Sequence, residues 1–351
     1  MTTDPGPAGS SVARRVRPVR LGVLGYAAIF TGAIFPSLAG SIAVTVTAIA
    51  SRRQISVPDD SIRLYTGEGA YQQLLDDPQI DAVYIPLPNH LHKEWTIKAA
   101  EAGKHVLCEK PLGVTAAEAS EMVEACSASG VQLVEAFMYR YNPQHSRARE
   151  ILRSGEIGEL ALVRVGFTVP LDDPHRNVRY GPYPGAGAIH DVGSYGINLA
   201  RWMMGDEPTR AHAFACNLPG TQADILHAIT LEFPADRLAT ISGGLAQARK
   251  NTYELIGSTG RIEVERPFAT PPFVESDGDL VLQVTTPAGT REEAFPDASQ
   301  YAMQMEQFAR LVRGEPNEVY RPDDSILTLH VIDACMRSLA SGASERVNFN
   351  G

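Results

Sequence analysis

The chain carries no charged side chain between Leu21 and Ala50, in the stretch LGVLGYAAIFTGAIFPSLAGSIAVTVTAIA. By hydropathy the stretch is similar to a membrane anchor, but a membrane helix needs about 20 apolar residues without a break. Several glycines and Pro36 interrupt the run, and a proline inside a helix costs about 3 kcal/mol. The interruptions predict four short elements instead: a strand over 19–24, a turn at Gly25, a buried helix over 27–38 and a strand over 44–50. Parallel strands that are covered on both faces are nearly continuously apolar, which accounts for the missing charges.

Arg14 and Arg15 precede this run, as they would in a twin-arginine export signal, and that alternative stays open. Against it, no small-residue cleavage site precedes a new domain, and the second strand continues directly into polar sequence. Residues 1–18 are rich in proline, glycine, serine and arginine, so we predict a disordered tail there.

Strand and helix patterns alternate through the first 140 residues. The apolar runs DAVYIPLP, HVLCEKP and VQLVEAF predict strands, whereas HKEWTIKAAEAG and TAAEASEMVEACSASG predict helices. Thr115 and Glu118 form a capping box at the start of the second helix. Such alternation is typical of right-handed βαβ units around a parallel sheet. We therefore predict an α/β protein in which residues 19–138 form a doubly wound, dinucleotide-binding (Rossmann) domain.

The pattern changes after Tyr139. A helix, a strand and the helix of IHDVGSYGINLARWMMG are followed by a series of strands at hairpin-like spacing, which predicts an open, mostly antiparallel sheet. Two helical segments, YAMQMEQFARLVRG and DSILTLHVIDACMRSLASG, end the chain. We predict that residues 139–351 form an α+β domain for substrate binding, whose last helix packs back on the first domain.

The composition excludes some classes of function. With a formal net charge of −10, the chain lacks the surplus of lysine and arginine that nucleic-acid binding requires. The four cysteines show no C-x-x-C spacing, which indicates free thiols in a reducing compartment rather than disulfides or a zinc site. We expect a cytoplasmic protein without a nucleic-acid partner and without membrane attachment.

The turn after the first strand is a candidate dinucleotide site, because the N-terminus of the following helix would face a pyrophosphate. The expected pattern is G-x-G-x-x-G/A, and Gly25-Tyr26-Ala27-Ala28-Ile29-Phe30 keeps only its first glycine. Ala27 still allows the backbone to come close, whereas Phe30 replaces the small residue that normally permits tight packing of helix on sheet. A buried turn that binds no ligand is the alternative interpretation.

The second strand ends in Ser51-Arg52-Arg53. An acidic residue at this position would hold the ribose hydroxyls of NAD, whereas a hydroxyl and guanidinium groups suit the 2′-phosphate of NADP. We predict NADP as the cofactor, with NAD as the alternative. The alternative interpretation of these three residues is a solvated basic loop.

The motif Glu109-Lys110-Pro111 stands at the carboxyl end of a predicted strand, the edge at which doubly wound folds bind ligands. A lysine at this edge can donate to a sugar oxygen and stabilise the alkoxide that forms during hydride transfer. Glu109 beside it can hold the lysine in place. An E-K-P triplet alone is most often an exposed loop.

In GAGAIHDVGSYGINLARW, Asp191 and Tyr195 are four residues apart and therefore project from one face of a helix. A carboxylate and a phenol one turn apart can hold a substrate oxygen and protonate it. A helix-terminal aspartate beside a packed tyrosine is the structural alternative. His190, and the pair His90 and His92, lack the spacing and the carboxylate of a metal site. We expect no metal ion, and we expect the loop of the pair to lie along the cofactor.

Five motifs occur together in a characteristic order: DAVYIPLPNHLH, GKHVLCEKPLG, EAFMYRYNPQH, GAGAIHDVGSYGINLARWMMG and NTYELIGSTGRIEVERPF. In this order and spacing they resemble the Gfo/Idh/MocA family of pyridine-nucleotide sugar oxidoreductases, from about Arg20 to Ser341. Two branches are most similar: the NDP-hexose 3-ketoreductases of deoxysugar biosynthesis and the NADP-linked xylose and dihydrodiol dehydrogenases. The chain departs from the family pattern at Phe30, in its uncharged first helix, and in G-A-G-A-I where the family has G-G-G-A-L.

The resemblance implies roles for individual residues. The family's lysine falls on Lys110, its acid/base tyrosine on Tyr195 and its aspartate on Asp191; the last two also contact substrate. The cofactor contacts that it implies are Gly25, Tyr26, Ala27, Ala28, Ile29, Ser51, Arg52, Arg53, Pro86, Leu87, Asn89, His92, Glu109, Lys110 and Glu135, the last near the nicotinamide ribose. Arg176 and Arg179 would suit a phosphorylated or nucleotide-linked sugar, and we include Arg179 among the substrate contacts.

We therefore predict an enzyme, an NADP(H)-dependent oxidoreductase that transfers a hydride between the nicotinamide and a hydroxyl or keto carbon of a sugar or sugar derivative. The alternatives are an NADP-binding regulator without activity and an enzyme like glucose–fructose oxidoreductase, with a tightly bound cofactor. Relatives pair through the open sheet of the second domain, so the resemblance implies a homodimer or homotetramer.

Overall fold

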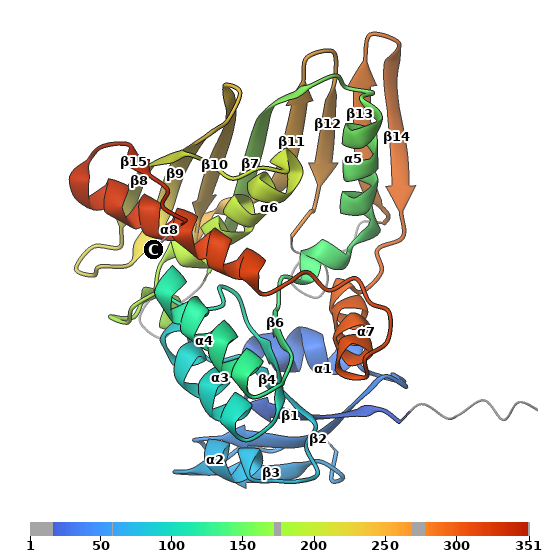
Figure 1. Ribbon diagram of the computed structural model, residues 1–351, viewed down its shortest axis with the longest axis vertical. Helices are drawn as coiled ribbons and strands as arrows, with labels where there is room; N and C mark the ends of the chain where they lie inside the picture. Colours follow the sequence, from blue (N-terminus) through green and yellow to red (C-terminus); the bar gives the residue numbers. More distant parts are fainter. Residues whose placement is uncertain (1–16, 58, 172–176, 269–277, 350–351) are drawn as a thin grey trace, which may run out of the picture.

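The computed structural model describes residues 17–57, 59–171, 177–268 and 278–349 (Figure 1). Its first sheet is parallel throughout, with the strand order β3-β2-β1-β4-β5-β6. The strands are β1 (Val19–Leu24), β2 (Val44–Ser51), β3 (Arg63–Thr66), β4 (Ala82–Ile85), β5 (His105–Cys108) and β6 (Leu133–Glu135). The order reverses between β1 and β4, which is the switch point at which doubly wound folds bind ligands. The predicted Rossmann architecture is confirmed.

The uncharged stretch forms the centre of this sheet. β1 pairs with both β2 and β4, and Leu21, Val23 and Leu24 are fully buried, as are Ala48 and Ala50 of β2. The missing charges therefore reflect burial between the two layers that cover the sheet. The described residues include no helix with the length and apolar character of a membrane span. Arg14, Arg15 and all but the last two residues of the predicted tail lie outside the described residues.

The helix between β1 and β2 has an unusual form. It is π-helical over η1 (Phe30–Ile34) and α-helical over α1 (Phe35–Ser37). The Phe30 ring is buried, and its centroid lies 5.6 Å from that of Phe35 and 6.4 Å from that of Tyr84 in β4. The i→i+5 hydrogen bonds of a π turn make the helix wider than an α-helix. This wider turn holds a phenyl ring against the sheet where the family pattern has a small residue.

Three further helices complete the first domain: α2 (Ala70–Leu75), α3 (His92–Glu101), which follows the short η2 (Asn89–Leu91), and α4 (Ala116–Ala128). α4 begins as predicted, because the Thr115 hydroxyl accepts a hydrogen bond from the Glu118 N–H (3.3 Å). The Glu118 carboxylate accepts from the Val114 N–H (2.8 Å), one residue before the position expected for a capping box.

The second sheet has the order β14-β13-β12-β11-β7-β10-β9-β8-β15. Its pairings are antiparallel except for that of β7 with β10, so the prediction of a mostly antiparallel sheet is confirmed. The strands are β7 (Leu160–Pro170), β8 (Arg210–Asn217), β9 (Asp224–Phe233), β10 (Arg237–Gly244), β11 (Ala246–Gly257), β12 (Arg261–Glu265), β13 (Leu280–Thr286), β14 (Gly289–Phe295) and β15 (Glu345–Arg346).

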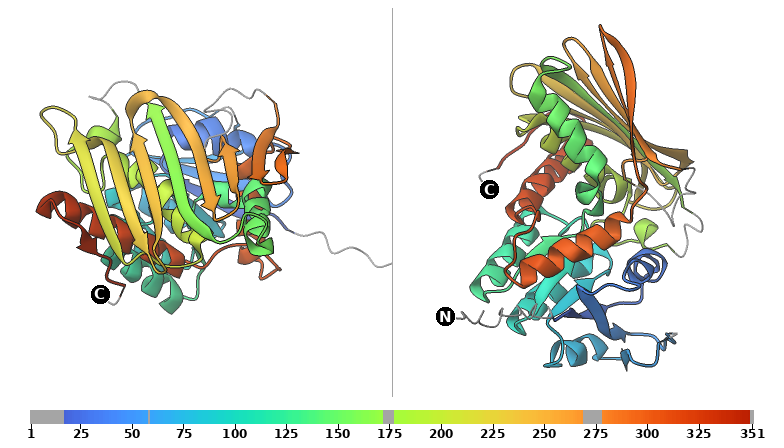
Figure 2. Two further views of the ribbon diagram at one scale, coloured as in Figure 1. Left: turned by 90° about the horizontal axis from the view of Figure 1, so that it is seen from above. Right: turned by 90° about the vertical axis from the view of Figure 1, so that its right-hand side faces the viewer.

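Helices cover only one face of this sheet, and Figure 2 shows the other face open. The covering helices are α5 (Pro143–Ser154), α6 (Ser194–Met204) and α8 (Asp323–Ser341). Short helical turns accompany them: η3 (Met138–Tyr141), η4 (Val178–Tyr180) and the π-helical η5 (Ile189–Gly193). The open face carries exposed apolar side chains, among them Phe214 (65% exposed), Leu226 and Leu238.

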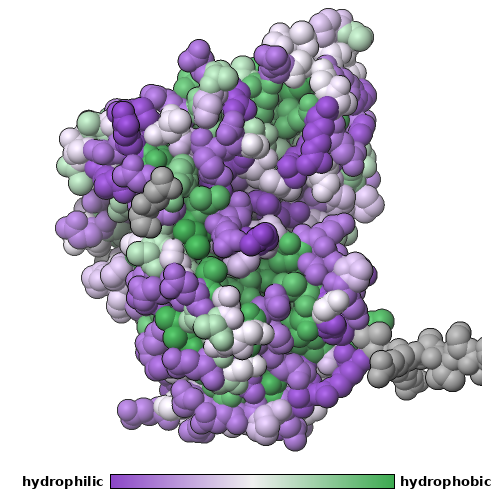
Figure 3. All heavy atoms as spheres, viewed as in Figure 1, coloured by the Kyte–Doolittle hydropathy of each residue, from purple (hydrophilic) through white to green (hydrophobic). Residues whose placement is uncertain are grey.

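Two C-terminal helices join the domains. α8 packs against α4, and the Ala116 N–H donates to the Asp333 carboxylate (3.0 Å). α7 (Gln300–Val312) packs against η1 and β2, and the Arg313 guanidinium beyond it donates to the Ala43 carbonyl (3.3 Å). On the face drawn in Figure 3, apolar side chains are exposed mainly in the middle, where the two domains meet.

Three strands escaped the sequence analysis. β3, which was predicted as a polar loop, is a short strand at the sheet edge with little buried surface. β14 and β15 also lie at sheet edges, and β14 has the polar sequence GTREEAF. Edge strands are exposed, so their sequences lack the apolar alternation that identifies a half-buried strand.

We predict that Phe30→Ala, which restores a small residue, destabilises the fold by about 3–5 kcal/mol, because it removes a buried ring from between η1 and β4. Urea unfolding of the full chain measures this loss. Ile42→Ala, at a side chain that is 83% exposed, should leave the free energy of unfolding within about 0.5 kcal/mol of the parent. Equal stability of Phe30→Ala and the parent would contradict the packing role of Phe30.

Candidate active site

Four predicted motifs follow the carboxyl ends of parallel strands. Gly25 follows β1, Arg52 follows β2, Pro86 follows β4 and Glu109 follows β5. Neighbouring parallel strands end at the same edge, so these residues share one rim of the first sheet. Residues of the second domain reach this rim through contacts with Asn89, His90 and Lys110.

The turn after β1 requires glycine. Gly25 has φ +112°, and a Cβ atom there would lie 2.9 Å from the Leu87 side chain. Its N–H donates to the Ala50 carbonyl of β2 (2.8 Å). After Tyr26 come two small side chains, those of Ala27, which is partly exposed, and Ala28, which is exposed. A bare backbone followed by two alanines before a helix fits the pyrophosphate of a dinucleotide. Tyr26 and Ile29 are half-buried beside this turn.

The end of β2 presents donors to the solvent. Ser51 is buried, and its hydroxyl accepts a hydrogen bond from the Arg53 N–H (3.1 Å), which fixes the bend. Arg52 and Arg53 are exposed. Burial raises the pKa of Tyr71, and the neighbouring Arg52 opposes that rise. Two guanidinium groups at this rim fit a ribose 2′-phosphate.

The loop after β4 is tied to the loop after β5. His92 is fully buried, with Nδ1 2.9 Å from the Pro111 carbonyl oxygen and Nε2 2.7 Å from that of Leu87. Burial lowers the pKa of the His92 ring. His92 therefore holds two loops together through their main chains, and Pro86 and Leu87 are themselves buried.

The same loop also contacts the second domain. Asn89 Nδ2 donates to the Gly185 carbonyl (2.8 Å). The His90 ring stacks on Tyr183, with centroids 4.5 Å apart and planes 12° apart. These two contacts bring residues 183–185 over the rim of the first sheet.

Lys110 lies at the junction of the domains. Its Nζ donates to Asp191 Oδ1 (2.7 Å) and to the Asp191 carbonyl oxygen (2.9 Å) in η5 of the second domain. Glu109, beside it, does not hydrogen-bond that ammonium; instead its Oε1 accepts a hydrogen bond from the Tyr84 hydroxyl (2.5 Å). Burial raises the pKa of Glu109, and Tyr84 and Lys110 oppose this rise.

Asp191 is bound by two cations. Lys110 approaches Oδ1, and Arg179 Nε donates to Oδ2 (2.6 Å). Burial opposes ionisation of this carboxyl, but Arg179 and Lys110 outweigh burial and hold its pKa well below the usual range. Asp191 is therefore a carboxylate near neutral pH, and it fixes the Lys110 ammonium in space.

Tyr195 lies beside the same ammonium. Lys110 Nζ is 4.6 Å from the centroid of the Tyr195 ring, and the Tyr195 hydroxyl donates to Met138 Sδ (3.4 Å). Phe137, Phe167 and other aromatic rings surround it, and burial raises its pKa well above the usual value. Lys110, Asp191 and Tyr195 thus meet in one place, and the phenol there is protonated at neutral pH.

Glu135, at the end of β6, is buried beneath the lysine loop. Its Oε1 accepts from the Leu112 N–H (2.8 Å), and its main-chain oxygen accepts from the Tyr320 hydroxyl (2.6 Å). Oε2 has no hydrogen-bond partner among the described residues, although Ser325 is near. Burial raises the pKa of Glu135 to about 7. A buried acceptor without a partner fits a hydroxyl of a bound ribose.

The sequence analysis missed Tyr84. Its side chain points from a buried strand to Glu109, and in the run DAVYIPLP it is indistinguishable from a core residue. His190 is buried, and its Nε2 lies 3.1 Å from the Val114 carbonyl oxygen, a contact between domains. Arg176, a candidate substrate contact, lies outside the described residues.

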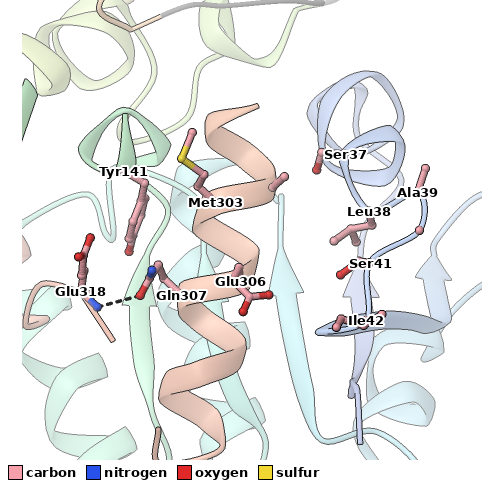
Figure 4. A pocket seen from close by; sticks show the side chains of 12 residues that line it. Ser37, Leu38, Ala39, Ser41, Ile42, Tyr141, Met303, Glu306, Gln307 and Glu318 are labelled. Atoms are coloured by element: carbon pink, nitrogen blue, oxygen red, sulfur yellow. Dashed lines mark hydrogen bonds between the residues drawn. The ribbon is translucent and has the colours of Figure 1, made fainter. Parts of the chain in front are cut away.

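A separate groove runs between α7 and the loop that follows α1 (Figure 4). The end of α1 and its loop, including Ile42, form one side. Met303 and Glu306 of α7 form the other, beside Gln307, which accepts from the Glu318 N–H (2.8 Å). The groove has no residue in common with the site around Lys110.

Comparison with protein families agrees with this geometry. The profile of the oxidoreductase family with an NAD-binding Rossmann fold matches residues 19–137, and that of the GFO/IDH/MocA C-terminal domain matches residues 145–263. The chain belongs to the GFO/IDH/MocA oxidoreductase family. The resemblance inferred from the motifs is confirmed.

Individual relatives cover nearly the whole chain. D-xylose 1-dehydrogenase (NADP(+)) 2 of Haloferax volcanii is 34% identical, over 92% of this chain and 98% of that protein. dTDP-3,4-didehydro-2,6-dideoxy-alpha-D-glucose 3-reductase of Saccharopolyspora spinosa is 33% identical, over 85% of this chain and 88% of that protein. KijD10, a 3-ketoreductase from Actinomadura kijaniata crystallised with NADP and TDP-benzene, has a TM-score of 0.83 at 30% identity, over 92% of this chain and 98% of that one.

We predict a pH-dependent effect of Glu135→Gln on stability without bound cofactor. A carboxyl whose pKa is raised by folding contributes its full stabilisation below its unfolded pKa of about 4.5, and this contribution is lost progressively as pH rises from there through about 7. The amide of the variant does not ionise, so the variant should gain stability relative to the parent between about pH 5.5 and about pH 8. Thermal unfolding at both pH values measures this gain. Glu124→Gln, at an exposed site, is the control, and a difference for Glu135→Gln that does not change with pH would contradict the assignment.

Proposed function

We propose that the protein is an NADP(H)-dependent oxidoreductase that transfers a hydride between the nicotinamide and a hydroxyl or keto carbon of a sugar or sugar derivative. The observation that carries the proposal is the meeting of Lys110 with Asp191 and Tyr195, from two domains, at the rim of the parallel sheet. The family and the NADP in the KijD10 complex support it.

Tyr195 moves the proton of the reacting oxygen. Its phenol is protonated at neutral pH, so it can donate to a keto oxygen during reduction and accept the proton back in the reverse direction. Its partner Met138 is a thioether, a weak acceptor that a substrate oxygen can replace. NADPH, when bound, supplies the hydride.

Lys110 polarises the reacting oxygen and Asp191 orients the lysine. Because Asp191 holds the ammonium with both its carboxylate and its carbonyl, the charge is fixed before substrate arrives. A cation over the Tyr195 ring also favours the negative charge that develops on the phenol as its proton leaves. The exposed Arg179, the second partner of Asp191, can reach the substrate from the same side.

The residues at the rim account for the cofactor. The Gly25 turn would hold the pyrophosphate, Ser51 to Arg53 the 2′-phosphate, and Glu135 the nicotinamide ribose. The NADP dependence named for the Haloferax volcanii enzyme supports NADP over NAD. His92, with both ring nitrogens facing main-chain carbonyls, would act on the cofactor through the loops that it joins.

Relatives act on two kinds of sugar, a free pentose and a nucleotide-linked keto sugar, and we propose that the substrate belongs to one of these classes. Residues 19–138 would bind the cofactor and residues 139–351 the substrate. We propose a cytoplasmic homodimer or homotetramer that pairs through the open sheet face, because Phe214, Leu226 and Leu238 are exposed on it.

We predict that Lys110→Met and Tyr195→Phe each lower turnover at least about 100-fold, because each removes a proton-transfer or charge-stabilising group. Nicotinamide absorbance, followed across aldoses, inositols and NDP-keto sugars, measures turnover. Lys98→Met, on the surface of α3, is the matched control and should leave turnover unchanged. Binding of NADPH without turnover of any sugar would contradict an enzymatic role.

We predict that Arg52→Ala reduces the preference for NADPH over NADH at least about tenfold, because it removes a charge-assisted hydrogen bond to the 2′-phosphate. The ratio of kcat/KM for the two cofactors measures the preference. Arg310→Ala, at an exposed arginine of α7, should leave the ratio unchanged. An unaltered ratio in Arg52→Ala would exclude Arg52 from the phosphate site.

A further inference from the structure

Asp191 stands on a helical turn that has no capping side chain of its own. The turn is η5, a π-helical segment, and its N-cap residue is Ala188. The first N–H groups of any helix lack partners within the helix and need acceptors from elsewhere. The position of Asp191 therefore depends on what holds the start of η5.

The acceptor comes from the second sheet. Asp224, the first residue of β9, is buried, and its Oδ2 accepts a hydrogen bond from the Ile189 N–H (2.9 Å). Gly187 makes room for this carboxylate: its φ is +101°, and a Cβ atom there would lie 2.0 Å from Asp224 Oδ1. A carboxylate at the N-terminus of a helix is also favoured by the helix dipole.

β9 supports the other end of η5 as well. The His227 ring is buried, and a Cβ atom added to Gly193 would lie 3.0 Å from it. His227 Nδ1 lies 3.9 Å from Asp224 Oδ2. Burial raises the pKa of Asp224 to about 6 and lowers that of His227 to about 4, so near neutral pH the pair is a carboxylate beside a neutral ring.

The same turn also places the second cation on Asp191. The Gly187 N–H donates to the Arg179 carbonyl (2.8 Å), and the Asp191 N–H donates to the Gly187 carbonyl (3.2 Å). Arg179 and Asp191 are therefore joined through Gly187, the residue packed on Asp224. Loss of the Asp224 carboxylate would loosen both partners of the ion pair.

We propose that Asp224 is a positioning residue: by capping η5 from β9, it fixes Asp191 where Asp191 holds the Lys110 ammonium. Its effect on turnover rests on the proposed function, whereas its effect on Lys110 does not. Asp224 makes no hydrogen bond to the side chains of Lys110, Asp191 or Tyr195, and it acts through the main chain of residues 187–191.

The first test is independent of activity. The Lys110 side chain is only 9% exposed, so an amine-reactive acylating reagent should label it slowly in the full chain, and mass spectrometry measures that rate against Lys98, whose side chain is 40% exposed. We expect Asp224→Ala to raise the labelling of Lys110 at least about fivefold relative to Lys98. Asp224→Asn keeps an oxygen that can accept from Ile189 and should restore most of the protection. The proposal is overturned if Lys110 in folded Asp224→Ala is labelled at the parental rate, or if it is labelled as fast in Asp224→Asn as in Asp224→Ala.

The second test uses turnover. We expect Asp224→Ala to lower kcat at least about tenfold while the Kd for NADPH changes less than about twofold, with partial rescue in Asp224→Asn. Ser299→Ala removes a comparable cap from α7, where the Ser299 hydroxyl accepts from the Ala302 N–H, and should lower the Tm without changing kcat or Lys110 labelling. If Asp224→Ala does not fold, the partly rescued Asp224→Asn decides instead: it should show a small rise in Lys110 labelling and a small fall in kcat, and values equal to those of the parent overturn the proposal. Absence of turnover in the parent contradicts the proposed function, and the labelling result still decides the role of Asp224.

Discussion

The site depends on one ion pair that crosses between the domains. Asp191 of the second domain lies between Lys110 of the first domain and Arg179 of its own. A buried carboxylate is costly unless it is paired and hydrogen-bonded, so the two cations and Asp191 need one another. This requirement ties the two domains together at the point where the phenol of Tyr195 also lies.

Irregular backbone occurs twice in the described residues. One π-helical segment, η1, follows the Gly25 turn, and the other, η5, carries Asp191. Such segments are rare in proteins and are frequent at functional sites. The ring of Phe30 packs against Tyr84 at the first segment, and the carboxylate of Asp224 accepts from the first N–H of the second. Regular α-helices would place the side chains of Phe30 and Asp191 differently.

Much of the fold and of the site could be predicted from the sequence. The alternation of apolar runs and amphipathic helices indicated the parallel sheet, and the spacing of four between Asp191 and Tyr195 put both on the side of η5 and α6 that faces Lys110. Other features had no local signal. Nothing near Tyr84 or Asp224 in the sequence indicates their partners, which are 25 and 35 residues away. The parallel pairing of β7 with β10 likewise depends on how distant strands meet.

The sequence by itself determined the two kinds of sheet, the glycine at the first turn and the residue types available at each strand end, because periodicity and steric demand act locally. The tertiary structure alone decided which of those residues meet. It placed Lys110 on Asp191 rather than on Glu109, turned Glu109 to Tyr84, and set Asp224 under η5. The reason is physical: the energy of a buried charge depends on every partner within a few ångströms, and such partners come from segments whose distance along the chain carries no information about their distance in space.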